Sequence, residues 1–230
     1  MKYRILMGFC SGGTLHDYTA KAPVTRPLLV NWTRQLLDGL AYLHEHRYIH
    51  HQINSTHVLL SSADITSCYL KIGGLIHANR ALSYDGLSMD PDFGITTRFK
   101  APEEIMGRGD EVEESVAQKT DIWSLGCVII EMVTGSMPKF YKSTDAGALT
   151  EITEDLAVMY FIGSNGCPTV PSELSAECKH FINQCLKKKA AHRPSAEELK
   201  DHPFLLPSKI KKGKFRSTAG TFLACFRHRR

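Results

Sequence analysis

Apolar residues recur at helical spacing early in the chain. Leu29, Leu36, Leu40 and Leu43 follow one another at intervals of seven, four and three residues, which places them on one face of a helix. Pro27 stands near the start, where a proline is tolerated because the first N–H groups of a helix have no internal partner. The pattern predicts a long helix that is buried along one side.

A second segment, Asp121–Gly135, is apolar nearly all round. A helix of that kind must be buried on most sides. Thr120 or Asp121 is the expected cap of its start, and Gly135 is the expected cap of its end. Further helices are predicted from about Thr14 and at about residues 153–162, 175–187 and 195–201.

Short apolar runs at residues 3–7, 57–60 and 69–72 predict strands, and a polar loop joins the last two. Residues 76–100 show no clean period and contain glycine and proline, so they predict a long loop. One central buried helix ringed by others, beside short strands, describes a mainly helical fold of the α+β class.

The composition is ordinary for a globular protein, with 43% hydrophobic and 23% charged residues, and the length of 230 residues suits one domain. Lys2 and Arg4 interrupt the first apolar residues, and no later apolar run is long enough to cross a membrane. The seven cysteines are odd in number and lack C-x-x-C spacing. Reduced thiols in a cytoplasmic protein are therefore expected, rather than disulfides or a zinc site.

The positive charge is concentrated at one end of the sequence. Residues 208–230 hold eight basic side chains and no acidic one, so the net charge of +4 leaves −4 for residues 1–207. The plain interpretation of 207–230 is a solvated, disordered tail. The alternative is an electrostatic contact with a membrane or an acidic partner.

The candidate chemistry lies between residues 48 and 60, which read Tyr-Ile-His-His-Gln-Ile-Asn-Ser-Thr-His-Val-Leu-Leu. The shape is that of a protein-kinase catalytic loop, H-R-D-x-K-x-x-N followed by an apolar strand. Only His50 matches, while Gln52 stands at the base position and Asn54 at the lysine position. His57 stands at the position of the metal-binding asparagine. A glutamine side chain has no carboxylate that could accept a proton.

Further motifs follow in the order that kinases have them. They are Lys71-Ile72-Gly73, Ala101-Pro102-Glu103, Asp121-Ile122-Trp123-Ser124-Leu125-Gly126 and His192-Arg193-Pro194-Ser195. With these motifs, residues 1–206 resemble the large lobe of a eukaryotic protein kinase. The resemblance is greatest to MEKK-type serine/threonine kinases, the MAP kinase kinase kinases of the STE group.

The resemblance implies structural roles for five residues. Glu103 and Arg193 are expected to form a buried salt bridge, and removing one partner of such a pair typically costs about 3–5 kcal/mol. Asp121 is expected to support the backbone of the catalytic loop, His50 to pack in the core, and Trp123 to build the central helix.

The same resemblance implies that the catalytic positions are empty. Magnesium would be held from positions 57 and 74, which here offer the imidazole of His57 and no side chain at Gly74. Magnesium prefers oxygen ligands. We therefore expect no intact catalytic residue, and no bound cofactor, although the family uses ATP and magnesium.

A literal Asp92-Phe93-Gly94 does not change this expectation. The functional D-F-G motif follows a strand, whereas no apolar run precedes Asp92. Six residues separate Gly94 from Ala101 and span at most about 20 Å, too little for an activation loop and a docking segment. The strand that ends near Ile72 makes Gly74 the equivalent of the metal-binding aspartate.

Two other features each have a functional and a plain interpretation. Thr96 and Thr97 form a candidate peptide-docking or phosphorylation site, or else an ordinary loop. The histidines between His44 and His57 are of a type that binds zinc or copper. A common helix face for them is not expected, because the chain should leave the helix before His50, so packing is favoured.

The small lobe of a kinase is not expected, because one strand precedes the hinge-like segment Gly8–Gly13 and no glycine-rich loop or V-A-I-K lysine is present. We predict a pseudokinase that acts by binding proteins, with kinases of a MAP kinase cascade as candidate partners and no nucleic acid. Two alternatives stay open. One is an active ATP-dependent serine/threonine kinase with substitute residues, and the other is a non-functional fragment or decayed duplicate.

Overall fold

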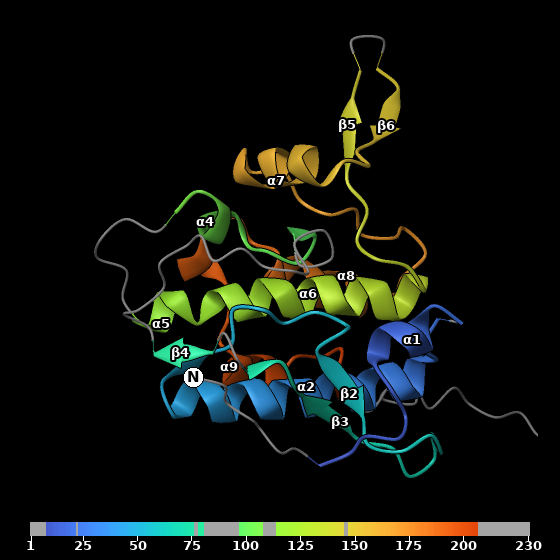
Figure 1. Cartoon of the computed structure of the whole chain (residues 1–230). Coiled ribbons are helices and arrows are strands. Elements are labelled where there is room, and N and C mark those ends of the chain that lie inside the picture. The colour runs from blue at the N-terminus through green and yellow to red at the C-terminus, as the bar shows by residue number, and fades with distance from the viewer. Residues whose placement is uncertain are drawn as a thin grey trace, which may run out of the picture.

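A computed structural model describes residues 8–21, 23–75, 78–80, 97–107, 114–144 and 147–206. Four predicted features lie outside these ranges: the strand at 3–7, the D-F-G motif at 92–94, Thr96 and the basic segment 207–230. Within the described ranges helices predominate and strands are short, so the mainly helical fold class is confirmed (Figure 1).

Helices occupy the predicted places. They are α1 (Leu15–Thr19), α2 (Arg26–Glu45), α4 (Pro102–Ile105), α5 (Glu114–Ala117), α6 (Lys119–Thr134), α7 (Asp155–Gly163), α8 (Ala176–Cys185) and α9 (Ala196–Lys200), with a 3-10 turn over Ala190–His192. α2 begins one residue before Pro27, and α9 opens with the capping box of Ser195 and Glu198. The short helices α4 and α5 carry too few residues for a periodic signal.

The strands of the described chain form three antiparallel pairs. β1 (Tyr48–Ile49) pairs with β4 (Asn79–Arg80), β2 (Val58–Leu60) with β3 (Leu70–Ile72), and β5 (Tyr141–Ser143) with β6 (Leu149–Glu151). The β2–β3 pair confirms the two strands predicted on either side of a polar loop. β4 corrects the expectation of an unbroken loop over 76–100, because its backbone pairs with β1.

The core is built around α6, which crosses the middle of the molecule with α2 on one side and α7 and α8 on the other (Figure 1). Every residue of α6 from Thr120 to Met132 is buried, as its apolar composition predicts. The predicted face of α2 packs against this core through Leu29, Leu36 and Leu40, which are all buried.

The two ends of α6 differ in how well the sequence predicts them. Gly135 caps the C-terminus at φ +72°, a left-handed conformation that suits glycine. The expected N-terminal cap by Thr120 or Asp121 is wrong, since the helix begins at Lys119. The Thr120 hydroxyl donates to the Ala117 carbonyl of α5, and the Asp121 carboxylate points into the loop described below.

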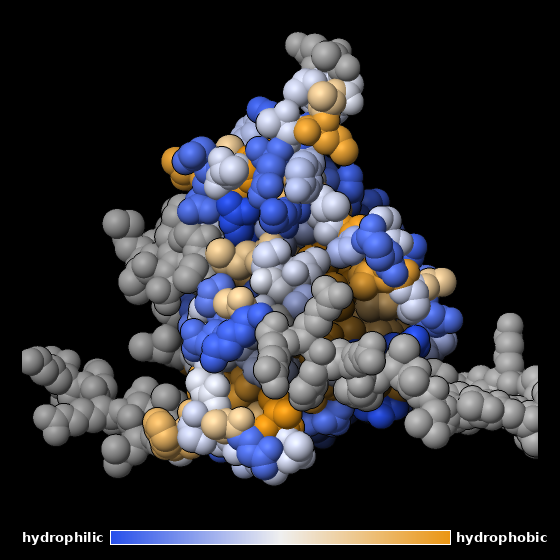
Figure 2. Space-filling view, turned by 90° about the vertical axis from the view of Figure 1, so that its right-hand side faces the viewer, coloured by the Kyte–Doolittle hydropathy of each residue, from blue (hydrophilic) through white to orange (hydrophobic). Residues whose placement is uncertain are grey.

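The hairpin of β5 and β6 projects from the body beyond α7 (Figure 1), and sequence reasoning missed it. Its strands have three residues each, and Lys142, Leu149 and Thr150 are exposed. The sequence therefore shows no alternation of apolar and polar positions that would predict a strand here. In the face shown in Figure 2 hydrophilic side chains predominate, and hydrophobic ones form separate patches to the right of the middle, near the bottom and near the top.

In the part of the chain that the structure describes, no helix is both long and apolar enough to span a membrane. The six cysteines described are free thiols. Burial raises the pKa of Cys178 to about 11 and raises the pKa of Cys127 and Cys185 as well. These thiols are therefore uncharged at neutral pH and behave as small apolar side chains.

Candidate functional site

The candidate site is the loop between β1 and β2, and one carboxylate of α6 holds its start. The Asp121 oxygens accept hydrogen bonds from the backbone N–H groups of His50 and His51, each at 2.9 Å, and His44 Nε2 lies 2.9 Å from Oδ2. Burial alone would raise the pKa of Asp121, but His44 and the neighbouring groups outweigh it and lower that pKa. The charged carboxylate thus fixes the backbone of the loop.

His50 lies in the core beneath this loop and is fully buried. Its Nε2 donates to the Gly73 carbonyl at 2.6 Å, and its Nδ1 accepts from the Gln52 N–H at 3.2 Å. The two bonds together define a neutral imidazole protonated at Nε2. Burial lowers the pKa of His50, which also favours the neutral form.

His51 joins the loop to α4. Its Nδ1 lies 3.2 Å from Glu104 Oε1, and both side chains are almost completely buried. The other oxygen of Glu104 accepts the Ala101 N–H at 3.2 Å, so this carboxylate also closes the start of α4. Sequence reasoning missed both residues, because His51 matches no motif and Glu104 gave no signal apart from its neighbour Glu103.

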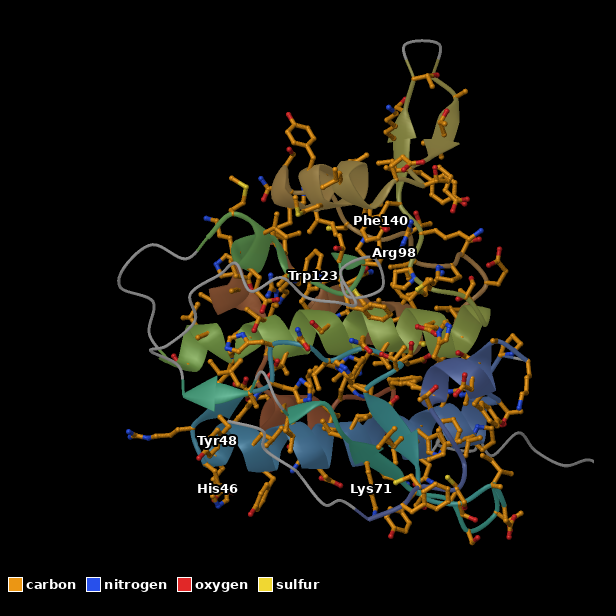
Figure 3. All side chains as sticks on the ribbon, in the orientation of Figure 1. His46, Tyr48, Lys71, Arg98, Trp123 and Phe140 are labelled. Atoms are coloured by element: carbon orange, nitrogen blue, oxygen red, sulfur yellow. The ribbon has the colours of Figure 1, made fainter. Side chains whose placement is uncertain are left out.

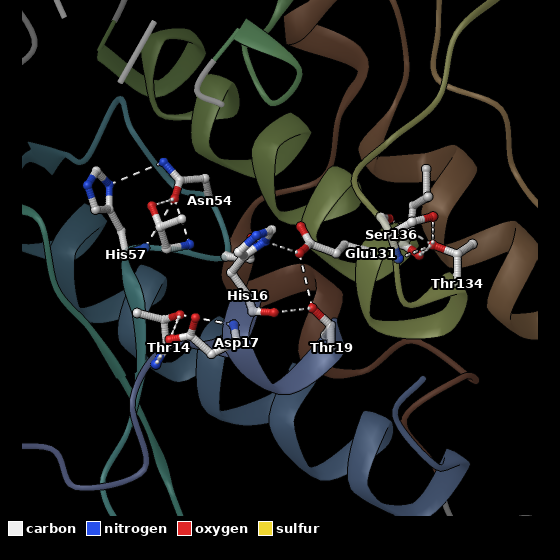
Figure 4. A network of polar contacts seen from close by, with 12 residues as sticks. Thr14, His16, Asp17, Thr19, Asn54, His57, Glu131, Thr134 and Ser136 are labelled. Carbon is white, nitrogen blue, oxygen red and sulfur yellow. Dashed lines mark hydrogen bonds and ion pairs between the residues drawn. The ribbon is translucent and has the colours of Figure 1, made fainter. Parts of the chain in front are cut away.

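The three substituted positions of the loop bind one another. The Gln52 backbone carbonyl accepts hydrogen bonds from His57 Nδ1 at 2.8 Å and from the Asn54 amide at 3.3 Å. Asn54 Oδ1 in turn accepts from the N–H groups of Thr56 and His57, at 2.9 and 3.1 Å. Figure 4 shows Asn54 beside His57. The polar groups of the Asn54 and His57 side chains are thus used to hold the loop itself.

Gly74 lies directly against the His57 ring. Its backbone is left-handed, at φ +70°, and a Cβ added there would meet three ring atoms of His57 at 2.5–2.8 Å. Real Cβ atoms do not approach other atoms so closely. The ring therefore fills the space that any side chain at position 74 would need.

These residues do not fit the magnesium that the family uses. An octahedral magnesium ion requires oxygen ligands. The two positions present an imidazole whose Nδ1 donates to Gln52, and a glycine whose side-chain space is filled. Among the described residues, no group of three or more His, Cys, Asp or Glu is placed to hold a metal ion.

A second polar network joins α1 to α6 next to the loop (Figure 4). Glu131 Oε1 accepts from His16 Nδ1 at 2.9 Å and from the Thr19 hydroxyl at 3.1 Å. The backbone N–H of His16 donates to the Ser55 carbonyl at 3.1 Å. α1 therefore contacts both the central helix and the loop.

The salt bridge between Glu103 and Arg193 braces the opposite side of α6. The guanidinium donates to both carboxylate oxygens, at 2.6 and 2.9 Å, and to the backbone carbonyl of Lys119 at 2.9 Å. Its centre lies 5.0 Å from the ring of Trp123, which Figure 3 places in the middle of the molecule. The Arg193 side chain is fully buried, whereas that of Glu103 is 24% exposed.

Of the two candidate threonines, Thr97 is fully buried and Thr96 lies outside the described residues. The neighbouring Arg98 donates to the carbonyls of Pro138 and Thr153, at 3.3 and 2.7 Å. The Ser124 hydroxyl of α6 donates to the Phe99 carbonyl at 2.8 Å. The segment before α4 is therefore tied both to α6 and to the region before α7.

Comparison with known proteins agrees with this geometry. A protein-family model described as "Protein kinase domain" matches residues 1–205. Mitogen-activated protein kinase kinase kinase 17 of Arabidopsis thaliana is 34% identical over 206 residues, covering 88% of this chain and 50% of the relative. MAP kinase kinase kinase wis4 of Schizosaccharomyces pombe is 31% identical over 214 residues, covering 89% of this chain and 14% of the relative. Mitogen-activated protein kinase kinase kinase 12 of Rattus norvegicus is 34% identical over 202 residues, covering 87% and 20%.

The fold, the bracing salt bridge and the shape of the loop define a protein-kinase large lobe, and the chain belongs to the protein kinase family. The resemblance to MAP kinase kinase kinases is confirmed by these relatives. The chain spans half the length, or less, of the relatives named here.

Proposed function

We propose that this chain is a pseudokinase, a catalytically inactive member of the family that acts by binding proteins. The observation that carries the proposal is the His57 ring, which fills the side-chain space of Gly74 while its Nδ1 binds the Gln52 carbonyl. Two positions that would supply metal ligands are thus joined in an internal contact.

The missing base points the same way. Phosphoryl transfer depends on positioning and on neutralising charge, with a carboxylate to orient the substrate hydroxyl. Gln52 is neutral at every pH at which the protein folds, so its side chain cannot take that proton. The loss concerns the base and the metal ligands together, and replacing one residue would not restore both.

The parts that build the lobe are intact, and they support a role in binding. Asp121 holds the loop, Arg193 and Glu103 brace α6, and the loop is closed by its own hydrogen bonds. The relatives are named as MAP kinase kinase kinases, so a kinase cascade is the context that we propose for the partners. The free thiols of the described chain suit a cytoplasmic location, which we also propose.

Transfer of labelled phosphate from ATP tests the proposal. The full chain is incubated with [γ-32P]ATP, magnesium or manganese, and a mixture of protein substrates, beside Gln52→Ala and Asp92→Ala variants. We expect no incorporation above that of heat-denatured protein. Transfer that is lost in either variant would show an active kinase with substitute residues and would overturn the proposal.

Nucleotide binding separates the remaining outcomes. A thermal-shift titration with ATP, with and without magnesium, is expected to leave the melting temperature unchanged up to about 1 mM, since ligand that binds only the native state raises stability. A magnesium-dependent rise at micromolar ATP would mean that the metal site works despite His57. That result would remove the observation on which the proposal rests.

A further inference from the structure

A groove of about 670 Å³ lies between the C-terminal half of α2 and the helix α9. Its lining includes three carboxylates, Asp38, Glu45 and Glu197, and a single lysine, Lys200. Asp38, Glu45 and Glu197 are exposed, while Ala196 closes the floor of the groove as a buried residue. The groove therefore offers excess negative charge on a surface that solvent can reach.

Lys200 does not neutralise the groove. Its Nζ lies 3.2 Å from Asp38 Oδ1 and 2.7 Å from Glu197 Oε2, so one positive charge is shared between two carboxylates. These two acidic side chains remain 68% and 74% exposed. With Glu45 beside them, the groove retains room and charge for further cationic groups.

The described chain ends on the N-terminal half of α2, where Leu206 lies with Arg26 and Val30, about 12–22 Å along the helix from Asp38 and Glu45. The guanidinium of Arg34 on α2 donates a hydrogen bond to the Leu205 carbonyl. Arg34 precedes Asp38 by four residues, and residues four apart on a helix are neighbours about 5–6 Å apart. The described chain thus ends one helical turn before the first groove residue of α2, and the groove extends from there toward the C-terminus of the helix.

The segment that follows has the complementary charge. Residues 208–230 carry eight basic side chains and no acidic one. We propose that this basic segment binds in the acidic groove between α2 and α9. Lys209, Lys211, Lys212 and Lys214 come first, and eight residues can span about 28 Å, which is several turns of α2.

One side chain, that of His44, connects the groove to the loop between β1 and β2. His44 lines the groove, and its Nε2 is 2.9 Å from the Asp121 carboxylate that holds the start of the loop. The Gln118 amide, also in the lining, donates to the His44 carbonyl at 2.9 Å. A bound basic segment would thus cover the residues that position Asp121, whether or not the protein transfers phosphate.

Zero-length cross-linking of the full chain tests this proposal. A carbodiimide joins a carboxylate to an amine only where the two are in contact, and peptide mass spectrometry identifies the pair. Lys200 with Asp38 or Glu197 serves as the internal positive control. In the monomer band, we expect intramolecular links that join a lysine of residues 209–214 to Asp38, Glu45 or Glu197.

Matched neutralising variants give the expected size of the effect. Asp38→Asn combined with Glu45→Gln removes two of the carboxylates that can react, so the readout is the links from these lysines onto the remaining Glu197. We expect these links to fall about fivefold, because two exposed charge pairs are removed without a change of shape. Glu154→Gln combined with Glu173→Gln, which neutralises two exposed carboxylates elsewhere, should leave them unchanged. Salt at about 0.5 M should reduce the links in the unchanged chain by screening.

Three results would overturn the proposal. Links from the basic segment spread equally over Glu154 and Glu173 would show contact without a site. Links confined to the dimer band would assign the groove to a second copy of the chain. A chain whose lysines form no groove links, but which binds vesicles of phosphatidylserine, would assign the segment to a membrane. Circular dichroism of each variant confirms that it is folded.

Discussion

At the scale of single residues, the backbone and one ring together restrict what position 74 accepts. The left-handed φ of Gly74 disfavours any residue with a Cβ, and the His57 ring occupies the place where that Cβ would lie. The two effects are separable, because Gly107 has a similar φ of +77° and no atom within 4 Å of an added Cβ.

Gly74→Ala should therefore lower the free energy of unfolding by more than Gly107→Ala does. Backbone strain alone is worth about 1–2 kcal/mol, which is the loss expected at Gly107. The contact with the His57 ring adds about 1–3 kcal/mol at Gly74. Urea denaturation followed by circular dichroism measures both changes.

Adding His57→Ala to Gly74→Ala provides the control for the ring. The double variant should lose less than the two single changes added together, because the smaller side chain vacates the space. Equal losses for Gly74→Ala and Gly107→Ala would show that the ring gives way easily, and that position 74 is closed by backbone conformation alone.

The buried His50 predicts a dependence of stability on pH. Burial lowers its pKa, so the folded protein resists protonation that the unfolded chain accepts below about pH 6.5. Below about pH 6.5 the unfolded state then binds more protons than the folded state. The contribution of His50 to the free energy of unfolding is therefore fully present above this pH and is lost as the pH falls below it. The slope is at most about 1.4 kcal/mol per pH unit for one group.

Unfolding at pH 7.5 and at pH 5.5 measures this loss in the unchanged chain and in His50→Asn. We expect the variant to be less stable at both values but to lose less between them. His202 contributes in the same direction, because burial and His180 lower its pKa, so the dependence should shrink without vanishing. An identical loss in both proteins would contradict the assignment to His50.

Sequence reasoning predicts which residue types stand in this loop but not how they are arranged in space. The missing carboxylates at Gln52 and Gly74 are visible in the order of residue types along the chain. The contact of His57 with Gly74 joins the residues just before β2 and just after β3, and it depends on the orientation of the ring. The pair of His51 and Glu104 depends on where α4 packs, which no local pattern of residues records.

At the scale of elements, the sequence predicts best where one pattern dominates. α6 was evident because every residue from Thr120 to Met132 meets the core, and α2 because one face does. The hairpin of β5 and β6 was missed because its strands are short and largely exposed. The sequence misplaces the start of α6 because the Asp121 carboxylate does not cap the helix. It accepts hydrogen bonds from the backbone of the distant loop instead.

The salt bridge that braces α6 should dominate the stability of its end of the lobe. Arg193→Leu leaves Glu103 and three backbone carbonyls without their donor, at an expected cost of about 3–5 kcal/mol. Lys139→Leu is the matched change at an exposed pair with Glu151, 3.5 Å apart, and should cost at most about 1 kcal/mol.

Chemical denaturation of the two variants compares these costs directly. Similar losses for Arg193→Leu and Lys139→Leu would mean that the buried guanidinium contributes no more than a surface pair. The guanidinium of Arg193 lies over the ring of Trp123, which allows a second measurement. The near-ultraviolet circular dichroism of the tryptophan should change in Arg193→Leu and not in Lys139→Leu.

At the scale of the whole molecule, the loop is the place where separate elements are joined. Asp121 connects it to α6, His51 connects it to α4, and Ser55 connects it to α1. None of these contacts requires nucleotide. The loop thus has a structural role in the lobe that does not depend on catalysis.

His44 of α2 binds the same Asp121 carboxylate that holds the loop, so α2 and α6 should unfold together if the loop unites the lobe in this way. Each carries one of the two tryptophans of the chain, and both Trp32 and Trp123 are fully buried. In Trp32→Phe and Trp123→Phe, the remaining tryptophan reports on one helix at a time. The fluorescence and the circular dichroism of each variant should give coincident urea midpoints, as a two-state transition requires.

Fluorescence that changes well before the loss of helix in one variant would show that the helix carrying the remaining tryptophan separates first. The contacts of the loop would then be too weak to couple the two sides of the lobe.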